Sequence, residues 1–290
     1  MIKAVLFDTF GTIVDWRSSI AREGAAVAAQ KGVADFDGDG FARAWRAGYR
    51  PGMARVTAGE RPWVSIDVIH RERLEEILPQ FGLPMLDEDE RDHLNRAWRA
   101  GYRPGMARVT AGERSWVSID VIYRERLDEI LPQFGLPMLD EAERDHLNRT
   151  WHRLTPWPDS VPGLKRIKSK FLISPLSNGS VVLLSTMAKR AGIPWDFIFS
   201  SDMHRAFKRN PAVYQNAIRL LGMKPDEIMM TAAHNDDLEA ARKEGMRTAY
   251  INRPTEYGID QKVDFEATSD WDIIADSVEG VADGLDCPKI

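Results

Sequence analysis

The stretch LFDTFGTIVD, from Leu6 to Asp15, places a single carboxylate at the end of an apolar segment. Residues 3–7 predict a strand, and Asp8 begins the turn that follows it. An unprotonated carboxylate can attack carbon or phosphorus and form an ester, so Asp8 is a candidate nucleophile. An Asp that only forms the turn or caps a helix is the alternative interpretation.

The chain beyond residue 157 alternates between predicted strands and predicted helices. Strands are expected at residues 171–174, 196–200, 227–231 and 247–251. Helices are expected at residues 181–191, 212–221 and 237–244, each followed by a glycine of the kind that ends helices. The alternation predicts an α/β fold with a doubly wound parallel sheet. Ligands bind such sheets beyond the carboxyl ends of the strands, where Asp8, Ser177 and residues 231–237 fall.

A long repeat lies between the first predicted strand and the others. Residues 43–95 recur as residues 96–148, and only four positions differ: Pro62/Ser115, His70/Tyr123, Glu75/Asp128 and Asp89/Ala142. Two copies are too few for a solenoid, so we interpret the repeat as a tandem in-frame duplication inside an otherwise complete protein. Apolar spacing predicts helices at residues 63–80 and 87–94 of the first copy.

The distance between the first two predicted strands indicates a large insertion. We expect an α/β core domain at residues 1–14 and 158–290, and an all-helical cap domain at residues 15–157 that contains both copies of the repeat. The apolar helical face of the duplicated segment needs a partner surface. We therefore predict a homodimer, formed through the duplicated cap helices.

Composition excludes several classes of protein. The 290 residues carry a net charge of −5, which argues against nucleic acid as the main partner and gives no sign of binding to an anionic membrane. The one cysteine, Cys287, cannot form an internal disulfide, which fits a reducing compartment. No stretch approaches the ~18 apolar residues of a membrane span, and no signal peptide is visible. We expect a cytoplasmic protein.

Four short motifs occur in order along the chain. They are FDTFGT (7–12), LSNG (176–179), FKRNPAVY (207–214) and AAHNDDLEAA (232–241). With the insertion after the first motif, the chain resembles the haloacid dehalogenase superfamily, and more closely the type II 2-haloacid dehalogenases. The segments WRAGYRPGM (45–53) and WHRLTPWPD (151–159) add to the resemblance. The order of the motifs, rather than any one of them, carries it.

The resemblance implies a set of catalytic residues. Asp8 would be the nucleophile, Lys208 would keep it ionised, and Asp237 would orient Lys208 and help to position the hydrolytic water. Phosphatases of this superfamily resemble one another in a second Asp two residues after the first, which protonates the leaving alkoxide. Phe10 stands at that position here. A halide leaves without a proton, so Phe10 favours carbon–halogen chemistry.

The resemblance also implies a set of substrate-binding residues. They are Thr12, Phe10, Arg46, Ser177, Asn178, Tyr214 and His234. Ser177, Lys208 and Arg46 would meet the substrate carboxylate, and Asn178 would face the departing halide. Arg99 duplicates Arg46 in the second copy, and we prefer Arg46 because its connection to the first strand resembles that of the family.

Two positions depart from the pattern of the family. Arg209 replaces a proline after Lys208, and a Ser-x-Asn arrangement before the last acid is replaced by Ala232 and His234. His234 could be a base or merely cap the end of a strand. Asp236 competes with Asp237 for the role of last acid.

The function expected from the resemblance is hydrolytic dehalogenation of short 2-haloalkanoic acids through an aspartyl ester, with neither metal nor cofactor. Two alternatives remain open. One is a Mg²⁺-dependent phosphatase, in which Asp8, Asp236 and Asp237 would bind the ion. The other is an inactive duplication variant whose extra helices drive oligomerisation.

Overall fold

The structure is a computed structural model that describes residues 1–82, 142, 146, 149–204, 206–259 and 261–289. The chain divides into two compact units, of which the first contains Met1–Ile77 and Asp145–Ile290 and the second contains Leu78–Arg144. Everything below concerns the first unit unless stated. The second copy of the repeat and the predicted helix at residues 87–94 lie outside the described residues, apart from residues 142 and 146. The duplication of the cap and the predicted domain boundaries therefore stay predictions.

Six strands form one parallel sheet in the order β5-β4-β1-β6-β7-β8. Their bounds are β1 Ala4–Phe7, β4 Leu172–Ser177, β5 Phe199–Ser200, β6 Ile228–Ala232, β7 Arg247–Ile251 and β8 Ile273–Ala275. Every residue of β1 and β6 is buried, as expected for central strands covered on both faces. Phe7 pairs with Pro175 of β4 and Thr231 of β6, so the residue after Phe7 emerges at the middle of the carboxyl edge.

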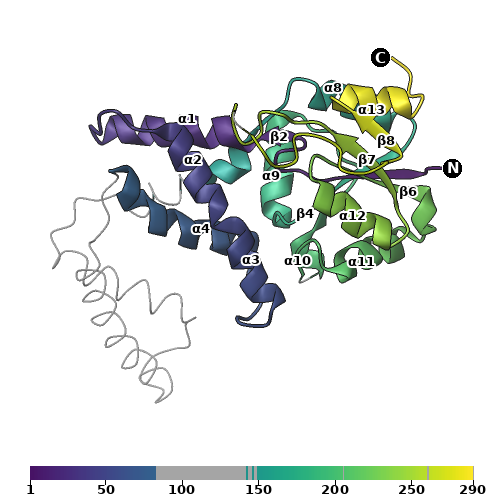
Figure 1. Cartoon of the computed structure of the whole chain (residues 1–290), viewed down its shortest axis with the longest axis horizontal. Coiled ribbons are helices and arrows are strands. Elements are labelled where there is room, and N and C mark those ends of the chain that lie inside the picture. The colour runs from purple at the N-terminus through teal and green to yellow at the C-terminus, as the bar shows by residue number, and fades with distance from the viewer. Residues whose placement is uncertain (83–141, 143–145, 147–148, 205, 260, 290) are drawn as a thin grey trace. The chain divides into compact units, whose positions relative to one another are not determined.

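Helices cover the sheet on both faces, which confirms the predicted α/β fold (Figure 1). They are α8 Ser160–Lys168, α9 Val181–Ala191, α10 Ser201–His204, α11 Pro211–Leu221, α12 Asn235–Lys243 and α13 Val278–Gly284. The helix α8 packs against α13, and α11 packs against α12. Gly192 and Gly222 end α9 and α11 in the left-handed conformation, at φ of 67° and 62°, as the sequence predicted.

The described polypeptide between the short strands β2 Val14–Asp15 and β3 Thr155–Pro156 forms a further set of helices. They are α1 Trp16–Gln30, α2 Gly38–Ala47, α3 Tyr49–Thr57 and α4 Ile66–Ile77, followed later in the chain by the 3₁₀ turn η3 Arg149–Arg153. The chain leaves and returns to the core through β2 and β3, which form an antiparallel pair. Buried Trp45 joins α2 to α4 because its Nε1 donates to the carbonyl oxygen of His70 at 2.7 Å.

Some predicted bounds were too long. The helix expected at residues 63–80 is α4 Ile66–Ile77, and the 3₁₀ turn η1 Leu78–Phe81 follows it. The strand expected at residues 196–200 contains only Phe199–Ser200, although Asp196 bonds to Ile173 of β4 through both its backbone N–H and its carboxylate. None of the described helices is long and apolar enough to cross a membrane.

Candidate active site

Asp8 lies at the carboxyl end of the central strand β1. Its backbone N–H donates to the carbonyl oxygen of Thr231 at 2.9 Å, which extends the pairing of β1 with β6 by one residue. Its side chain is largely buried, with 8% of the residue exposed. The sheet therefore holds this carboxylate where loops from neighbouring strands meet.

Lys208 lies between two carboxylates. Its Nζ is 3.2 Å from Oδ1 of Asp8 and 2.7 Å from Oδ2 of Asp237. Tyr214, on α11, donates its hydroxyl to Oδ1 of Asp237. Tyr214 was predicted from the resemblance to bind substrate, but its hydroxyl is bonded to Asp237 and it does not line the pocket described below. The four side chains form a continuous buried polar chain from Tyr214 to Asp8.

The backbone around Lys208 is also fixed. Its N–H donates to Oδ1 of Asn178 at 2.8 Å, and the Lys208–Arg209 peptide bond is cis. The amide oxygen of Asn178 is therefore engaged by the backbone of Lys208. Ser177, expected to bind the substrate carboxylate, is buried at the end of β4 with its Oγ accepting the N–H of Gly179 at 3.3 Å, and it does not line the pocket.

The second oxygen of Asp8 receives two different donors. The Thr12 hydroxyl donates to Oδ2 at 2.8 Å, and Nδ1 of His234 lies 3.1 Å from the same oxygen. Burial alone would raise the pKa of Asp8, but the charge of Lys208 and the contacts with His234 and Thr12 outweigh it and lower the pKa far below its ordinary value. Asp8 is therefore an ionised carboxylate at neutral pH.

A pocket of about 300 Å³, its open mouth included, opens in front of Asp8. Its lining consists of Asp8, Phe10, Arg46, Tyr49, Arg50, Asn178, Lys208, Arg209 and His234. Cationic side chains outnumber the single carboxylate in this lining. The pocket is thus suited to an anion.

Arg46 enters the pocket from α2 and is surrounded by aromatic rings. Its Cζ lies 4.2 Å from the ring centroid of Tyr49, 5.4 Å from that of Trp16 and 6.0 Å from that of Phe10. Its Nη1 is buried and has no hydrogen-bond partner among the residues that the structure describes. A buried guanidinium donor without a partner is costly, so a ligand with an acceptor group would complete it.

Asp236 does not point at the same cation as Asp237. It forms ion pairs with Arg209 and, at 3.5 Å, with Arg50. The carboxylates considered for a Mg²⁺ site are thus bound by Lys208 or by arginines. In the described part of the chain no three His, Cys, Asp or Glu side chains are grouped as metal ligands. A divalent cation would have to compete with these cationic side chains for the carboxylate oxygens, so this donor set is a poor fit to Mg²⁺.

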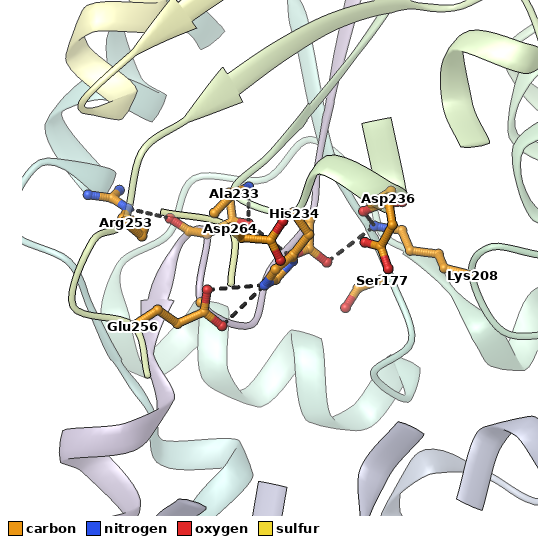
Figure 2. Close-up of polar contacts among 12 residues, drawn as sticks. Ser177, Lys208, Ala233, His234, Asp236, Arg253, Glu256 and Asp264 are labelled. Atoms are coloured by element: carbon orange, nitrogen blue, oxygen red, sulfur yellow. Dashed lines mark hydrogen bonds and ion pairs between the residues drawn. The ribbon is translucent and has the colours of Figure 1, made fainter. Parts of the chain in front are cut away.

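Several residues of the site were not predicted from the sequence. Glu256 is 1% exposed and faces the imidazole of His234 (Figure 2). Tyr49 and Arg50 line the pocket beside Arg46. The position of Glu256 just past β7 was the available signal, since loops after parallel strands meet at one edge of the sheet.

Comparisons with known proteins find haloacid dehalogenases among the relatives of this chain. A model of the haloacid dehalogenase-like hydrolases matches residues 2–245. A crystal structure of a defluorinating L-2-haloacid dehalogenase is 39% identical, with a TM-score of 0.77 over 99% of this chain and 96% of that one. A second L-2-haloacid dehalogenase structure is 33% identical, with a TM-score of 0.75 over 98% of this chain and all of that one.

Curated relatives match a shorter part of the chain. The (S)-2-haloacid dehalogenase 4A of Burkholderia cepacia is 32% identical over 120 residues, which are 39% of this chain and 52% of that protein. The chain spans about half the length of the first such relatives that it matches. The family model, in contrast, covers most of the chain together with Asp8, Lys208 and Asp237. This chain belongs to the haloacid dehalogenase-like hydrolases.

Proposed function

We propose that this protein hydrolyses the carbon–halogen bond of short (S)-2-haloalkanoic acids and releases 2-hydroxy acids. The arrangement around Asp8 carries the proposal: an ionised carboxylate with Phe10, rather than a second acid, two residues later. The names of the relatives support the same reaction.

In the first step, Oδ1 of Asp8 attacks the carbon that bears the halogen. A bond forms between Oδ1 and that carbon, and the carbon–halogen bond breaks with its electron pair on the halide. Halide needs no proton, so the aromatic side chain of Phe10 is compatible with this step where a phosphatase would need an acid. The first step leaves an ester between Asp8 and the substrate.

In the second step, water attacks Cγ of Asp8, and the bond from Cγ to Oδ1 breaks. The product keeps Oδ1 as its hydroxyl oxygen and takes one proton of the water, while the other proton is released and Asp8 returns as a carboxylate. Displacement at carbon followed by hydrolysis at Cγ predicts inversion at a chiral carbon. Asp237, fixed by Lys208 and Tyr214, belongs to the machinery that we propose for positioning this water.

The cations of the pocket account for the carboxylate of the substrate. Within the described part of the chain, Arg46 has a buried donor without a partner, and a carboxylate is the acceptor that a guanidinium binds best. We assign the same role to Lys208 and the departing halide to Asn178, which both line the pocket, and we assign no substrate contact to Ser177, which does not line it. The small pocket and the defluorinating relative extend the proposal to fluoroacetate as a substrate.

The Mg²⁺-dependent phosphatase is disfavoured by the donor set. Lys208 bridges Asp8 and Asp237, and Arg209 and Arg50 hold Asp236. Binding of Mg²⁺ would require these ion pairs to break. A homodimer formed through the duplicated cap segment also remains a proposal.

Halide release from (S)-2-chloropropionate in the presence of EDTA tests the function. We expect release by the parent protein and none by Asp8→Asn, which keeps the shape of the side chain but removes the nucleophile. Loss of activity in EDTA together with hydrolysis of phosphate monoesters in Mg²⁺ would overturn the proposal in favour of the phosphatase.

A further inference from the structure

His234 is held between two carboxylates. Its Nδ1 lies 3.1 Å from Oδ2 of Asp8, and its Nε2 lies 3.1 Å from both Oε1 and Oε2 of Glu256 (Figure 2). His234 precedes α12, but its side chain does not cap that helix. A neutral imidazole has one donor and one acceptor nitrogen, and only the protonated ring can donate to both carboxylates.

Glu256 is fixed on the side of His234 that faces away from Asp8. It accepts the indole N–H of Trp16 at 3.0 Å, and it does not line the pocket. A Cβ on Gly11 would lie 2.0 Å from its Oε1, so the turn after β1 fits closely around this carboxylate. Among the described residues, His234 is the side chain that contacts both Glu256 and Asp8, so it provides the direct link between the two carboxylates.

The two oxygens of Asp8 have different surroundings. In the part of the chain that the structure describes, Oδ1 is contacted by Lys208, whereas Oδ2 is contacted by both Thr12 and His234. The Thr12 hydroxyl accepts the N–H of Ala233 at 2.9 Å, which leaves its proton directed at Oδ2. Once Oδ1 carries the substrate, Oδ2 becomes the carbonyl oxygen of the ester. Attack by water then places negative charge on Oδ2.

We propose that Glu256 is a positioning residue that keeps His234 protonated and directed at Oδ2, so that His234 and Thr12 stabilise the oxyanion formed when water hydrolyses the aspartyl ester. Preorganised donors at a developing oxyanion lower the barrier of such a step. The inference rests on the proposed function, because it concerns the second step of that reaction. It assigns a role to Glu256 that no ordered motif of the chain indicates.

The electrostatics of the site are consistent with this role. Burial would lower the pKa of His234, but the charge of Glu256 and the hydrogen bonds with Asp8 and Glu256 raise it well above its ordinary value. Asp236 is a further charged group close enough to be coupled to His234. A buried imidazolium next to two carboxylates is thus the stable form.

The test compares Glu256→Gln with the parent protein in rapid-quench experiments with (S)-2-chloropropionate. We expect ester hydrolysis to slow about 10- to 100-fold, because one oxyanion donor loses its charge, while ester formation changes less than about 3-fold. The ester should then accumulate and be visible as an added mass on the intact protein, and kcat and KM should fall together. Parallel slowing of both steps, with no accumulated ester, would overturn the proposal.

A matched background separates positioning from a structural role. In His234→Asn the side chain keeps an N–H donor but cannot be protonated. Glu256 therefore has no positive charge at position 234 to stabilise. Adding Glu256→Gln to this variant should change ester hydrolysis less than about 3-fold, since the coupling has already been removed. Equal slowing in both backgrounds would show that Glu256 only stabilises the loop.

Histidine side-chain ¹⁵N chemical shifts report the protonation state of His234 directly, without a substitution at Glu256. The shifts of His234, assigned with His234→Asn, should be those of an imidazolium at pH 8, and shifts of a neutral ring would overturn the proposal. The same rapid-quench experiment distinguishes failure of this inference from failure of the proposed function. If the parent protein releases no halide and forms no ester, it is the proposed function that fails.

Discussion

At the scale of a residue, Arg46 is the side chain whose duplicate offers a direct comparison. Arg46→Met should lower kcat/KM by about 10- to 100-fold, mainly through KM, because a charge-assisted hydrogen bond to the substrate carboxylate is lost. Arg99→Met, at the matching position of the second copy, should change it less than about 2-fold. Steady-state kinetics of both variants with (S)-2-chloropropionate would decide. A larger effect of Arg99→Met would identify the second copy as the working one.

The sequence predicts some of these residues much better than others. Thr12 and Lys208 lie in ordered motifs, and the structure places both within hydrogen-bond distance of Asp8. For Glu256 the sequence offers only its position after a predicted strand, because its partner His234 is 22 residues away and their contact depends on the neighbouring positions of β6 and β7. Composition and spacing also do not indicate that Tyr214 bonds to Asp237 rather than to Asp8.

At the scale of elements, Arg253 connects the turn after β1 with the starts of the helices α8 and α13. It donates to the carbonyl oxygen of Thr12 at 3.1 Å and forms a two-pronged ion pair with Asp159, both bonds at 2.8 Å, and Asp159 accepts the N–H of Val278 at 2.7 Å. The loop after β7 is thereby tied to the turn after β1 and to the start of both α8 and α13.

Arg253→Met should lower the free energy of unfolding by about 3 kcal/mol, because it leaves a partly buried carboxylate without its cation. In the Asp159→Asn background the same change should lower the free energy of unfolding by about 1–2 kcal/mol less than it does in the parent protein. Urea unfolding of the four proteins at pH 7 measures both values. Additive losses would show that the pair does not couple these elements.

The elements themselves were largely predictable from local pattern. β7, α9 and α11 were predicted to within about a residue, because apolar runs end at glycines or at a proline. The sequence analysis did not predict β8, α8 or α13, and β8 carries a weak signal because all three of its residues are at least partly exposed, as in an edge strand. The bonds of Asp196 to Ile173 join residues that are distant in sequence, and such contacts are not revealed by periodicity.

At the scale of the whole molecule, His234 makes stability depend on pH. Its pKa is raised by folding, so its contribution is fully present below the unfolded value of about 6.5 and is lost as pH rises through the folded value. The pKa of Asp8 is lowered, so its contribution is present above about 3.9 and is lost only as pH falls through the folded value.

The difference in unfolding free energy between the parent protein and His234→Asn should therefore shrink toward alkaline pH, by up to about 1.4 kcal/mol per pH unit. Effects of the other titrating groups are shared by the two proteins and largely cancel. Urea unfolding from pH 6 to pH 9.5 measures the difference. A constant difference over this range would contradict a raised pKa of His234.

The duplication is also tested on the whole molecule. Deleting residues 96–148 removes one copy and leaves Arg46 and the residues around Asp8 in place. We expect the shortened protein to keep halide release within about 3-fold and to lose the predicted dimer, which light scattering at micromolar concentration would show. A monomeric parent protein would contradict the predicted homodimer.

The central claim is that Asp8 forms an ester with the substrate, and a single turnover in ¹⁸O-labelled water tests it most directly. With protein in excess over (S)-2-chloropropionate, we expect the 2-hydroxy acid to contain unlabelled oxygen, donated by Asp8, and the peptide containing Asp8 to gain one ¹⁸O. A labelled hydroxyl group in the product of the first turnover would mean that water attacks the substrate directly, and would contradict this account.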